Sequence, residues 1–174
     1  MFKELNILER FMEEPVREFN VRELARIINK APATVSKKLQ QFAKKGILLE
    51  REERRLKLYK ANQESELYRD IKLFATLRAI KDSGLIMALN KFYLKPTIIL
   101  FGSAAKGMDT EVSDIDILII SEKIAKINNI GVYEKKLKRT IQVFTVKDIK
   151  GLKNKHLINN VLNGISIQGC IQWT

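Results

Sequence analysis

The most constraining feature of this sequence is a pair of acidic residues at the start of a long apolar run. Asp114 and Asp116 are separated by one residue and lead into the run 117–120, Ile-Leu-Ile-Ile. Because side chains alternate along a strand, both carboxylates are expected on the same face. Two carboxylates that close repel each other, and a divalent cation with a preference for oxygen ligands relieves the repulsion. The pattern therefore predicts a buried strand that begins at a magnesium site.

A glycine turn precedes this strand. The apolar run 97–101 ends in Gly102-Ser103, and Lys106 follows shortly after. Glycine permits close approach of the backbone, and Ser103 with the N–H groups of the next helical turn can hold a phosphate, aided by the charge of Lys106. Together the two halves predict a phosphate cradle that faces a metal site. The alternative is a surface Asp-x-Asp at a strand edge beside an ordinary Gly-Ser turn.

The order strand, Gly-Ser, ten residues, Asp-x-Asp and apolar strand resembles the motif of the nucleotidyltransferase superfamily related to polymerase β, in its minimal prokaryotic form. The resemblance covers about residues 96–150. It implies that Gly102 and Ser103 bind the phosphates of a nucleoside triphosphate, expected to be ATP. It also implies that Asp114 and Asp116 bind Mg²⁺ and are the catalytic acids.

The sequence departs from that family where a third acid is expected. The corresponding strand is 139–145, and the equivalent residue is Gln142, an amide that offers an oxygen but no charge. Two-metal phosphoryl transfer relies on carboxylates to hold both cations. Asp148, beyond the strand, and Glu111, in the loop before Asp114, are the other acids considered for this role. We therefore expect nucleotide binding with weak or absent transfer.

The first sixty residues predict a small helical domain with a hairpin. The expected elements are helices over 2–14, 21–28 and 33–45 and strands over 47–51 and 56–60. Asn20 is the expected N-cap of the second helix, and Gly46 is expected at the C′ position after the third. A charged tip, residues 52–55, joins the strands. Helix, helix, turn, helix and hairpin resemble the winged helix-turn-helix regulators.

The third helix has a basic, acid-free face opposite its apolar stripe. The candidate DNA-binding residues are Thr34, Ser36, Lys37, Gln40, Gln41 and Lys44 on this helix and Arg54 and Arg55 on the hairpin. Lysine can pair with phosphates or guanine, and glutamine with adenine. These residues predict double-stranded DNA as a partner. The alternative is a solvated basic face, which is favoured by Glu50, Glu52 and Glu53 because acids oppose phosphate contact.

The remaining pattern predicts an α/β (α+β) architecture with a mixed sheet. Residues 64–80 form an expected helix that is apolar on two sides, and a second helix is expected over 85–94. The runs 97–101, 115–120 and 141–146 are continuous and apolar, which is typical of strands covered on both faces. The predicted divisions are a winged helix-turn-helix domain over 1–62, a helical linker over 63–95 and a nucleotidyltransferase-like domain over 96–174.

Composition narrows the functional classes further. The chain has 174 residues, of which 45% are hydrophobic, and a formal charge of +12. The apolar content excludes a disordered tail, and no apolar run is long enough to cross a bilayer. The lone Cys170 excludes a disulfide framework, and the charged N-terminus lacks a secretory h-region. We expect a cytoplasmic protein with polyanionic partners and no membrane contact.

These observations lead to three hypotheses. The first is a DNA-binding transcriptional regulator, expected to be a homodimer, whose second domain binds nucleotide and Mg²⁺. The second is an active nucleotidyltransferase that modifies a protein or small molecule, similar to minimal nucleotidyltransferase antitoxins that act on a partner toxin. The third is a catalytically inactive interaction module. The combination of domains resembles a group of archaeal two-domain proteins.

Overall fold

The computed structural model describes residues 5–171, and the chain divides into two compact units between Lys72 and Leu73. This division lies within the helix α4 (Glu66–Asp82), inside the stretch expected as a helical linker. Each unit has its own hydrophobic core. The ends of the first and last predicted domains, residues 1–4 and 172–174, lie outside the described residues.

The first unit contains the predicted succession of helices and a hairpin. Its elements before α4 are α1 (Leu5–Glu13), β1 (Phe19–Asn20), α2 (Val21–Ile27), α3 (Pro32–Lys44), β2 (Leu48–Glu53) and β3 (Leu56–Ala61). The strand β1 was not predicted, because two residues are too few to show a periodicity. It pairs antiparallel with β3 and gives the sheet order β1-β3-β2. Phe19 of β1 is fully buried in the core of this unit.

Local capping explains where α2 begins and where α3 ends. The side chain of Asn20 accepts a hydrogen bond from the N–H of Glu23 at 2.9 Å, as the capping box predicts. At the end of α3, Gly46 has a φ of 71°, and its N–H donates to the carbonyl of Ala43. The N–H of Ile47 donates to the carbonyl of Phe42, which completes a Schellman motif and confirms the predicted role of Gly46.

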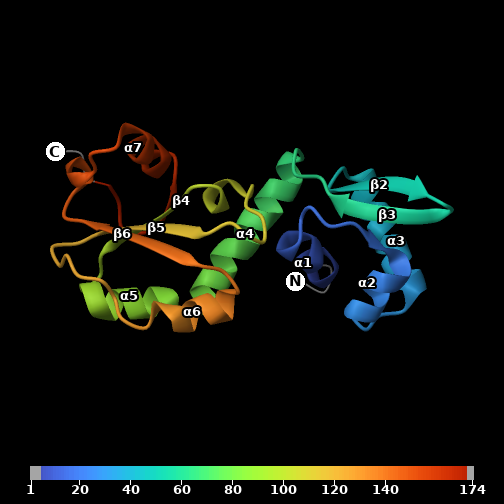
Figure 1. The fold of residues 1–174 in the computed structure, drawn as a ribbon, viewed down its shortest axis with the longest axis horizontal. Coiled ribbons are helices and arrows are strands. Elements are labelled where there is room, and N and C mark those ends of the chain that lie inside the picture. Colours follow the sequence, from blue (N-terminus) through green and yellow to red (C-terminus); the bar gives the residue numbers. More distant parts are fainter. Residues whose placement is uncertain (1–4, 172–174) are drawn as a thin grey trace. The chain divides into compact units, whose positions relative to one another are not determined.

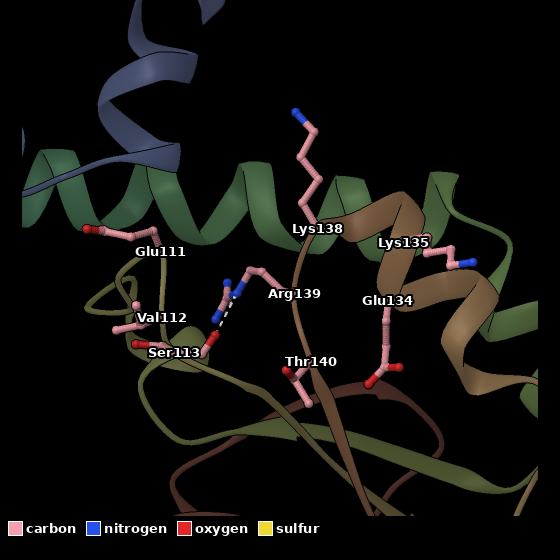
Figure 2. A pocket seen from close by; sticks show the side chains of 8 residues that line it. All are labelled: Glu111, Val112, Ser113, Glu134, Lys135, Lys138, Arg139 and Thr140. Carbon is pink, nitrogen blue, oxygen red and sulfur yellow. Dashed lines mark hydrogen bonds between the residues drawn. The ribbon is translucent and has the colours of Figure 1, made fainter.

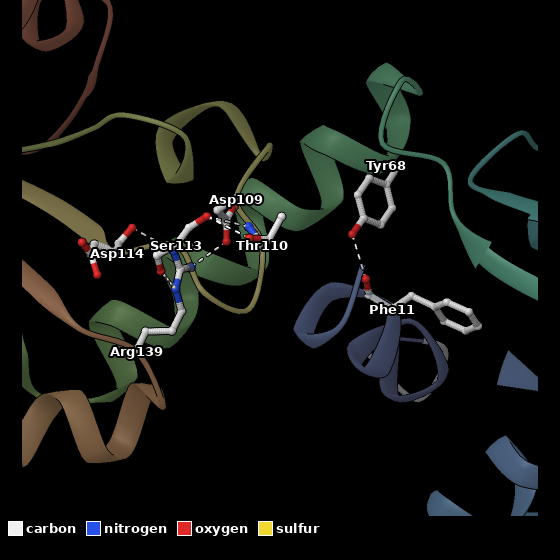
Figure 3. Close-up of polar contacts among 7 residues, drawn as sticks. All are labelled: Phe11, Tyr68, Asp109, Thr110, Ser113, Asp114 and Arg139. Atoms are coloured by element: carbon white, nitrogen blue, oxygen red, sulfur yellow. Dashed lines mark hydrogen bonds and ion pairs between the residues drawn. The ribbon is translucent and has the colours of Figure 1, made fainter. Parts of the chain in front are cut away.

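The amphipathic pattern of α3 is reproduced in the structure. Val35, Leu39 and Phe42 are buried and join a core formed by α1, α2 and the sheet. The start of α4 belongs to the same core, where the hydroxyl of Tyr68 donates to the carbonyl of Phe11 at 2.9 Å (Figure 3). The opposite side of α3 is therefore left to solvent.

The hairpin of the first unit is longer than predicted. Glu52 pairs with Lys57 and Glu53 with Leu56, so the loop contains only Arg54 and Arg55 rather than residues 52–55. Both arginines have positive φ, 48° and 65°, which is the conformation of a two-residue type I′ turn. This turn matches the twist of paired strands, and the strands consequently extend to the turn itself.

The second unit is built on a mixed sheet in the order β6-β5-β4-β7. Besides the end of α4, its elements are α5 (Leu85–Tyr93), β4 (Thr97–Phe101), η1 (Ala104–Lys106), β5 (Ile115–Ile120), α6 (Ile130–Leu137), β6 (Ile141–Val146), η2 (Ile149–Gly151), α7 (Lys155–Leu162) and β7 (Ile165–Gln168). The strands β5 and β6 are parallel, and the other pairs are antiparallel. The bounds of β4, β5 and β6 agree with the prediction, whereas α7 and β7 were not predicted from the polar C-terminal sequence.

Both faces of this sheet are covered, as its apolar strands require (Figure 1). Ile117 and Ile119 of β5 join the cluster that contains residues of α5, while Leu118 joins the opposite cluster with Val161 of α7. Because side chains alternate along β5, this strand contributes residues to the hydrophobic clusters on both faces of the sheet.

The longest helix in the described part of the chain, α4, is 17 residues long and contains charges along its length. Between residues 5 and 171, no helix is long and apolar enough to cross a membrane. The expectation that the chain has no membrane-spanning helix agrees with this finding.

Candidate metal and nucleotide site

The two halves of the sequence motif meet at one end of the second sheet. Phe101, the last residue of β4, pairs with Asp116 of β5 in the antiparallel register. Gly102 follows Phe101 directly and therefore lies against Asp116. The ten residues between Ser103 and Asp114 only have to return the chain to the same end of the sheet.

Gly102 is required at its position for two separate reasons. Its φ is 75°, in the region that favours glycine. A Cβ built on Gly102 would also overlap Oδ2 of Asp116. The backbone at Gly102 thus lies so close to the Asp116 carboxylate that a side chain at position 102 would displace the acid.

Ser103 and Lys106 lie in the compact turn that follows. Ser103 precedes η1, and its carbonyl accepts hydrogen bonds from the N–H of Lys106 at 3.1 Å and of Met108 at 3.0 Å. Ser103 is half-buried, whereas Lys106 is exposed. A phosphate could reach the Ser103 hydroxyl, and Lys106 could contribute charge only by reaching in from solvent.

Asp114 and Asp116 are held differently although they are two residues apart. Asp116 lies within β5 and is paired with Phe101 on one side and with Gln142 of β6 on the other. Asp114 lies just before β5, and its Oδ2 accepts a hydrogen bond from Nε2 of Gln142. Gln142, which the resemblance suggested as the equivalent of a third acid, is therefore directly beside both acids.

The electrostatics of the pair favour a bound cation. Burial raises the pKa of the Asp116 carboxyl above its ordinary value, and the neighbouring charge of Asp114 raises this pKa further. The positive charge of Arg139 lowers the pKa of Asp116. The ionised form of Asp116 is disfavoured in the ligand-free protein, so a divalent cation there would relieve both causes.

The two other acids considered for the metal site are not gathered around it. Asp148 caps η2 by accepting a hydrogen bond from the N–H of Gly151 at 2.9 Å. Because β6 runs from Gln142 to Val146 at ~3.3 Å per residue, Asp148 lies at the other end of the sheet, and the suggestion that it substitutes for the third acid is wrong. In the described residues, no group of three or more His, Cys, Asp or Glu could hold a metal, so Glu111 does not complete such a set.

Glu111 instead lines an open pocket beside the site (Figure 2). The pocket has a volume of about 490 Å³, and its lining residues are Glu111, Val112, Ser113, Glu134, Lys135, Lys138, Arg139 and Thr140. Oε1 of Glu134 accepts a hydrogen bond from the N–H of Ile141, so this acid has a structural role at the start of β6. The pocket is lined by both acidic and basic side chains. Two of its lining residues also belong to or contact the loop that leads to Asp114, namely Ser113 and Arg139.

Sequence reasoning missed Arg139 and Asp109. Arg139 precedes β6 and forms an ion pair with Asp109 at 2.6 Å, and the side chains are only 14% and 3% exposed (Figure 3). It also donates to the carbonyls of Ser113 and Asp114 at 2.9 Å each. The only available indication in the sequence was an arginine directly before an apolar strand, which is indistinguishable from the surface charges around it.

The candidate DNA-binding residues are gathered separately, in the first unit. Thr34, Lys37, Gln40, Gln41, Lys44, Arg54 and Arg55 are exposed, and Ser36 is half-buried. On the hairpin, Arg51 pairs with Glu18 and Glu53, and Lys57 pairs with Glu50. Two of the acids that oppose phosphate contact are thus neutralised within the hairpin. Arg54 and Arg55 form no ion pair within residues 5–171.

Comparison with known protein families gives a match within the second unit. Residues 85–169 match the family model described as polymerase beta, nucleotidyltransferase. The matched range begins with α5, ends just after β7, and includes the Gly-Ser turn, both acids and Gln142. The match supports the nucleotidyltransferase part of the predicted architecture, and a fold of this kind implies a nucleotide substrate. No curated protein matches the chain.

The raised pKa of Asp116 predicts that its removal stabilises the ligand-free protein. The pKa of the Asp116 carboxyl is higher in the folded protein than its ordinary value, so ionisation of Asp116 opposes folding. This cost grows as the pH rises from the ordinary value to the folded-state pKa and is constant above it. We expect Asp116→Asn to raise Tm at pH 7, by about 2–4 °C for each kcal/mol recovered, and the gain to shrink near pH 4.

Thermal denaturation in EDTA at both pH values measures this effect. Asp70→Asn, at an exposed position on α4, controls for the substitution itself. A variant that is equally or less stable than the wild type at pH 7 would contradict the electrostatic account.

Proposed function

We propose that residues 73–174, the unit that contains the nucleotidyltransferase match, bind a nucleoside triphosphate together with Mg²⁺. Asp114 and Asp116 hold the cation, Gly102 and Ser103 contact the phosphates, and Lys106 adds charge at the entrance. The observation that carries this proposal is the contact between Gly102 and Asp116, which brings the phosphate turn and the acids into one site. ATP is the nucleotide to test first.

The donor atoms fit magnesium bound as a nucleotide complex. Mg²⁺ is usually held by one or two carboxylates together with substrate phosphates and water, rather than by a cage of protein ligands. Two acids therefore suffice for a phosphate-bound cation, and Gln142 adds an amide without adding charge. When bound, the cation would neutralise phosphate charge and polarise the phosphoryl group.

We further propose that the first unit binds double-stranded DNA through α3 and the hairpin, in the manner of a winged helix-turn-helix. Support comes from the element order, from the exposed polar face of α3 and from the two arginines at the hairpin turn. Lysine and arginine would contact phosphates or guanine, and Gln40 or Gln41 would contact adenine. A palindromic operator would require two copies of the chain, so a homodimer belongs to the same proposal.

The two activities together describe a transcriptional regulator whose second unit senses a nucleotide. The neutral side chain of Gln142 supports weak or absent transfer, since two-metal chemistry draws on carboxylates for both cations. The second candidate function is an active nucleotidyltransferase with a protein or small-molecule acceptor, such as a toxin-type partner. The family match and the paired acids favour this candidate.

Binding of ATP to the proposed site can be tested with a matched pair of glycine variants. Gly102 and Gly84 both have positive φ, 75° and 86°, so alanine strains the backbone at both positions. Only the Cβ at 102 would meet Asp116, while nothing lies within 4 Å of the Cβ at 84. We expect Gly102→Ala and the double variant Asp114→Asn, Asp116→Asn to weaken Mg²⁺–ATP binding at least tenfold in calorimetry. Gly84→Ala should bind as the wild type does, and unchanged binding by the double variant would remove the site assignment.

Recognition of DNA by α3 predicts separable effects of its side chains. Lys37→Ala and Gln41→Ala should each cost about 1–3 kcal/mol of binding at a specific site if the residue contacts a base. A lysine that contacts only phosphate would instead reduce the salt dependence of binding. Lys81→Ala, which makes the same charge change on α4 of the other unit, is the control. Binding of genomic fragments at background level, without salt dependence, would make the first unit a protein-interaction module.

Because Gln142 is neutral, a negative charge at this position should increase Mg²⁺ affinity and transfer activity. Gln142→Asp should tighten Mg²⁺ binding, so the difference in Tm between Mg²⁺ and EDTA should be larger for the variant than for the wild type. The same change should raise any transfer activity. Transfer is measured with radiolabelled ATP, Mg²⁺ and whole-cell extract, with Asp116→Asn as the inactive control. Robust labelling by the wild type that Asp116→Asn abolishes would refute the inactive sensor and promote the transferase.

A further inference from the structure

We propose that Arg139 is a positioning residue for the metal site and acts through the main chain of Asp114. This inference rests on the proposed function of the second unit and assigns a role to a residue outside the nucleotidyltransferase motif. Among residues 5–171, the side-chain hydrogen bonds of Arg139 go to Asp109 and to two backbone carbonyls and not to the carboxylates of Asp114 and Asp116, although its charge lowers the pKa of Asp116. Its proposed role follows from its hydrogen bonds to the backbone around Asp114.

Arg139 holds the peptide groups on both sides of Asp114. Its Nε donates to the carbonyl of Ser113 and its Nη2 to the carbonyl of Asp114, both at 2.9 Å. The third interaction, from Nη1 to Asp109, fixes the guanidinium at the base of the loop. One planar side chain therefore determines the path of the backbone immediately before β5 (Figure 3).

Asp114 needs such support because the sheet does not provide it. The paired register of β5 and β6 begins at Ile115 with Ile141, so Asp116 lies inside the ladder and Asp114 outside it. The N–H of Ile115 donates to the carbonyl of Thr140 at 2.9 Å, which ties down the first residue after Asp114. Arg139 restrains the same peptide group through the carbonyl of Asp114 and the preceding group through the carbonyl of Ser113. The separation between the two carboxylates thus depends on the sheet at Asp116 and, at Asp114, on Arg139 at the backbone and Gln142 at the side chain.

The burial of Arg139 argues against a direct role in binding phosphate. Its side chain is 14% exposed, and its charge is met by the almost fully buried Asp109. Three of the five N–H donors of its guanidinium are already committed to one carboxylate and two carbonyls. Lysine at this position could keep the ion pair, but it lacks the planar fork that reaches three acceptors at once.

The test is a double-mutant cycle between Arg139 and Asp114 in the full chain, with Mn²⁺–ATP as the probe. We expect Arg139→Lys to weaken binding at least tenfold in calorimetry. In the Asp114→Asn background, the same change should alter the dissociation constant less than twofold, because the carboxylate that Arg139 positions is already gone. A merely structural role would instead make the two effects additive.

Further variants separate positioning from folding. Asp109→Asn removes the ion pair that fixes the guanidinium but leaves the contacts of Arg139 with both carbonyls available, so it should lower Tm and weaken binding by less than Arg139→Lys does. Arg78→Lys, which alters an exposed ion pair with Asp82 in the same unit, should change neither property. Binding by Arg139→Lys within twofold of the wild type, or additive effects in the cycle, would overturn the inference. A wild type that binds no Mn²⁺–ATP would overturn the proposed function itself.

Discussion

The repulsion between Asp114 and Asp116 is the constraint around which one end of the second sheet is organised. Burial and the neighbouring charge raise the pKa of Asp116, so the ligand-free arrangement stores unfavourable electrostatic energy. The surrounding residues keep the acids together despite this cost. Gly102 leaves room for the Asp116 carboxylate, Gln142 donates to Asp114, and Arg139 holds the adjoining backbone. This arrangement supports the proposed cation site, since a cation bound between the two acids would convert their repulsion into attraction.

In the proposed function, Gln142 is the residue that would separate nucleotide binding from nucleotidyl transfer. An amide beside two carboxylates satisfies a hydrogen bond and adds no negative charge, so it supports one cation brought in with a nucleotide more readily than two. The choice between the proposed sensor and the alternative transferase therefore depends on whether the site can support transfer with a neutral amide at this position of β6. Their common requirement is the geometry of the two acids, which depends on the backbone of β5 and of the loop before it.

The first unit distributes its charges in a different way. Its hairpin acids are largely paired with Arg51 and Lys57, and two of the arginines, at the turn, remain available to an external partner. On α3, burial of the apolar stripe directs lysines and glutamines to solvent. The acids that weakened the DNA hypothesis at the sequence level are thus partly compensated within the fold, which supports the proposal of a nucleic-acid surface.

The sequence by itself determined the features that depend on local chemistry. The bounds of β4, β5 and β6 follow from continuous apolar runs, and Asn20 and Gly46 act through hydrogen bonds to residues a few positions away. The proximity of Gly102 to the acids also followed, because a motif with two halves at strand ends leaves few arrangements. The resemblance also pointed to Gln142 as a neighbour of the acids. Only the tertiary structure decided the other surroundings of Asp114: Asp148 lies at the opposite end of the sheet, Arg139 donates to the carbonyl of Asp114, and loop folding buries Asp109 against Arg139. These contacts join residues about 25 to 30 positions apart, and no local pattern of hydrophobicity or charge encodes which distant partners will meet.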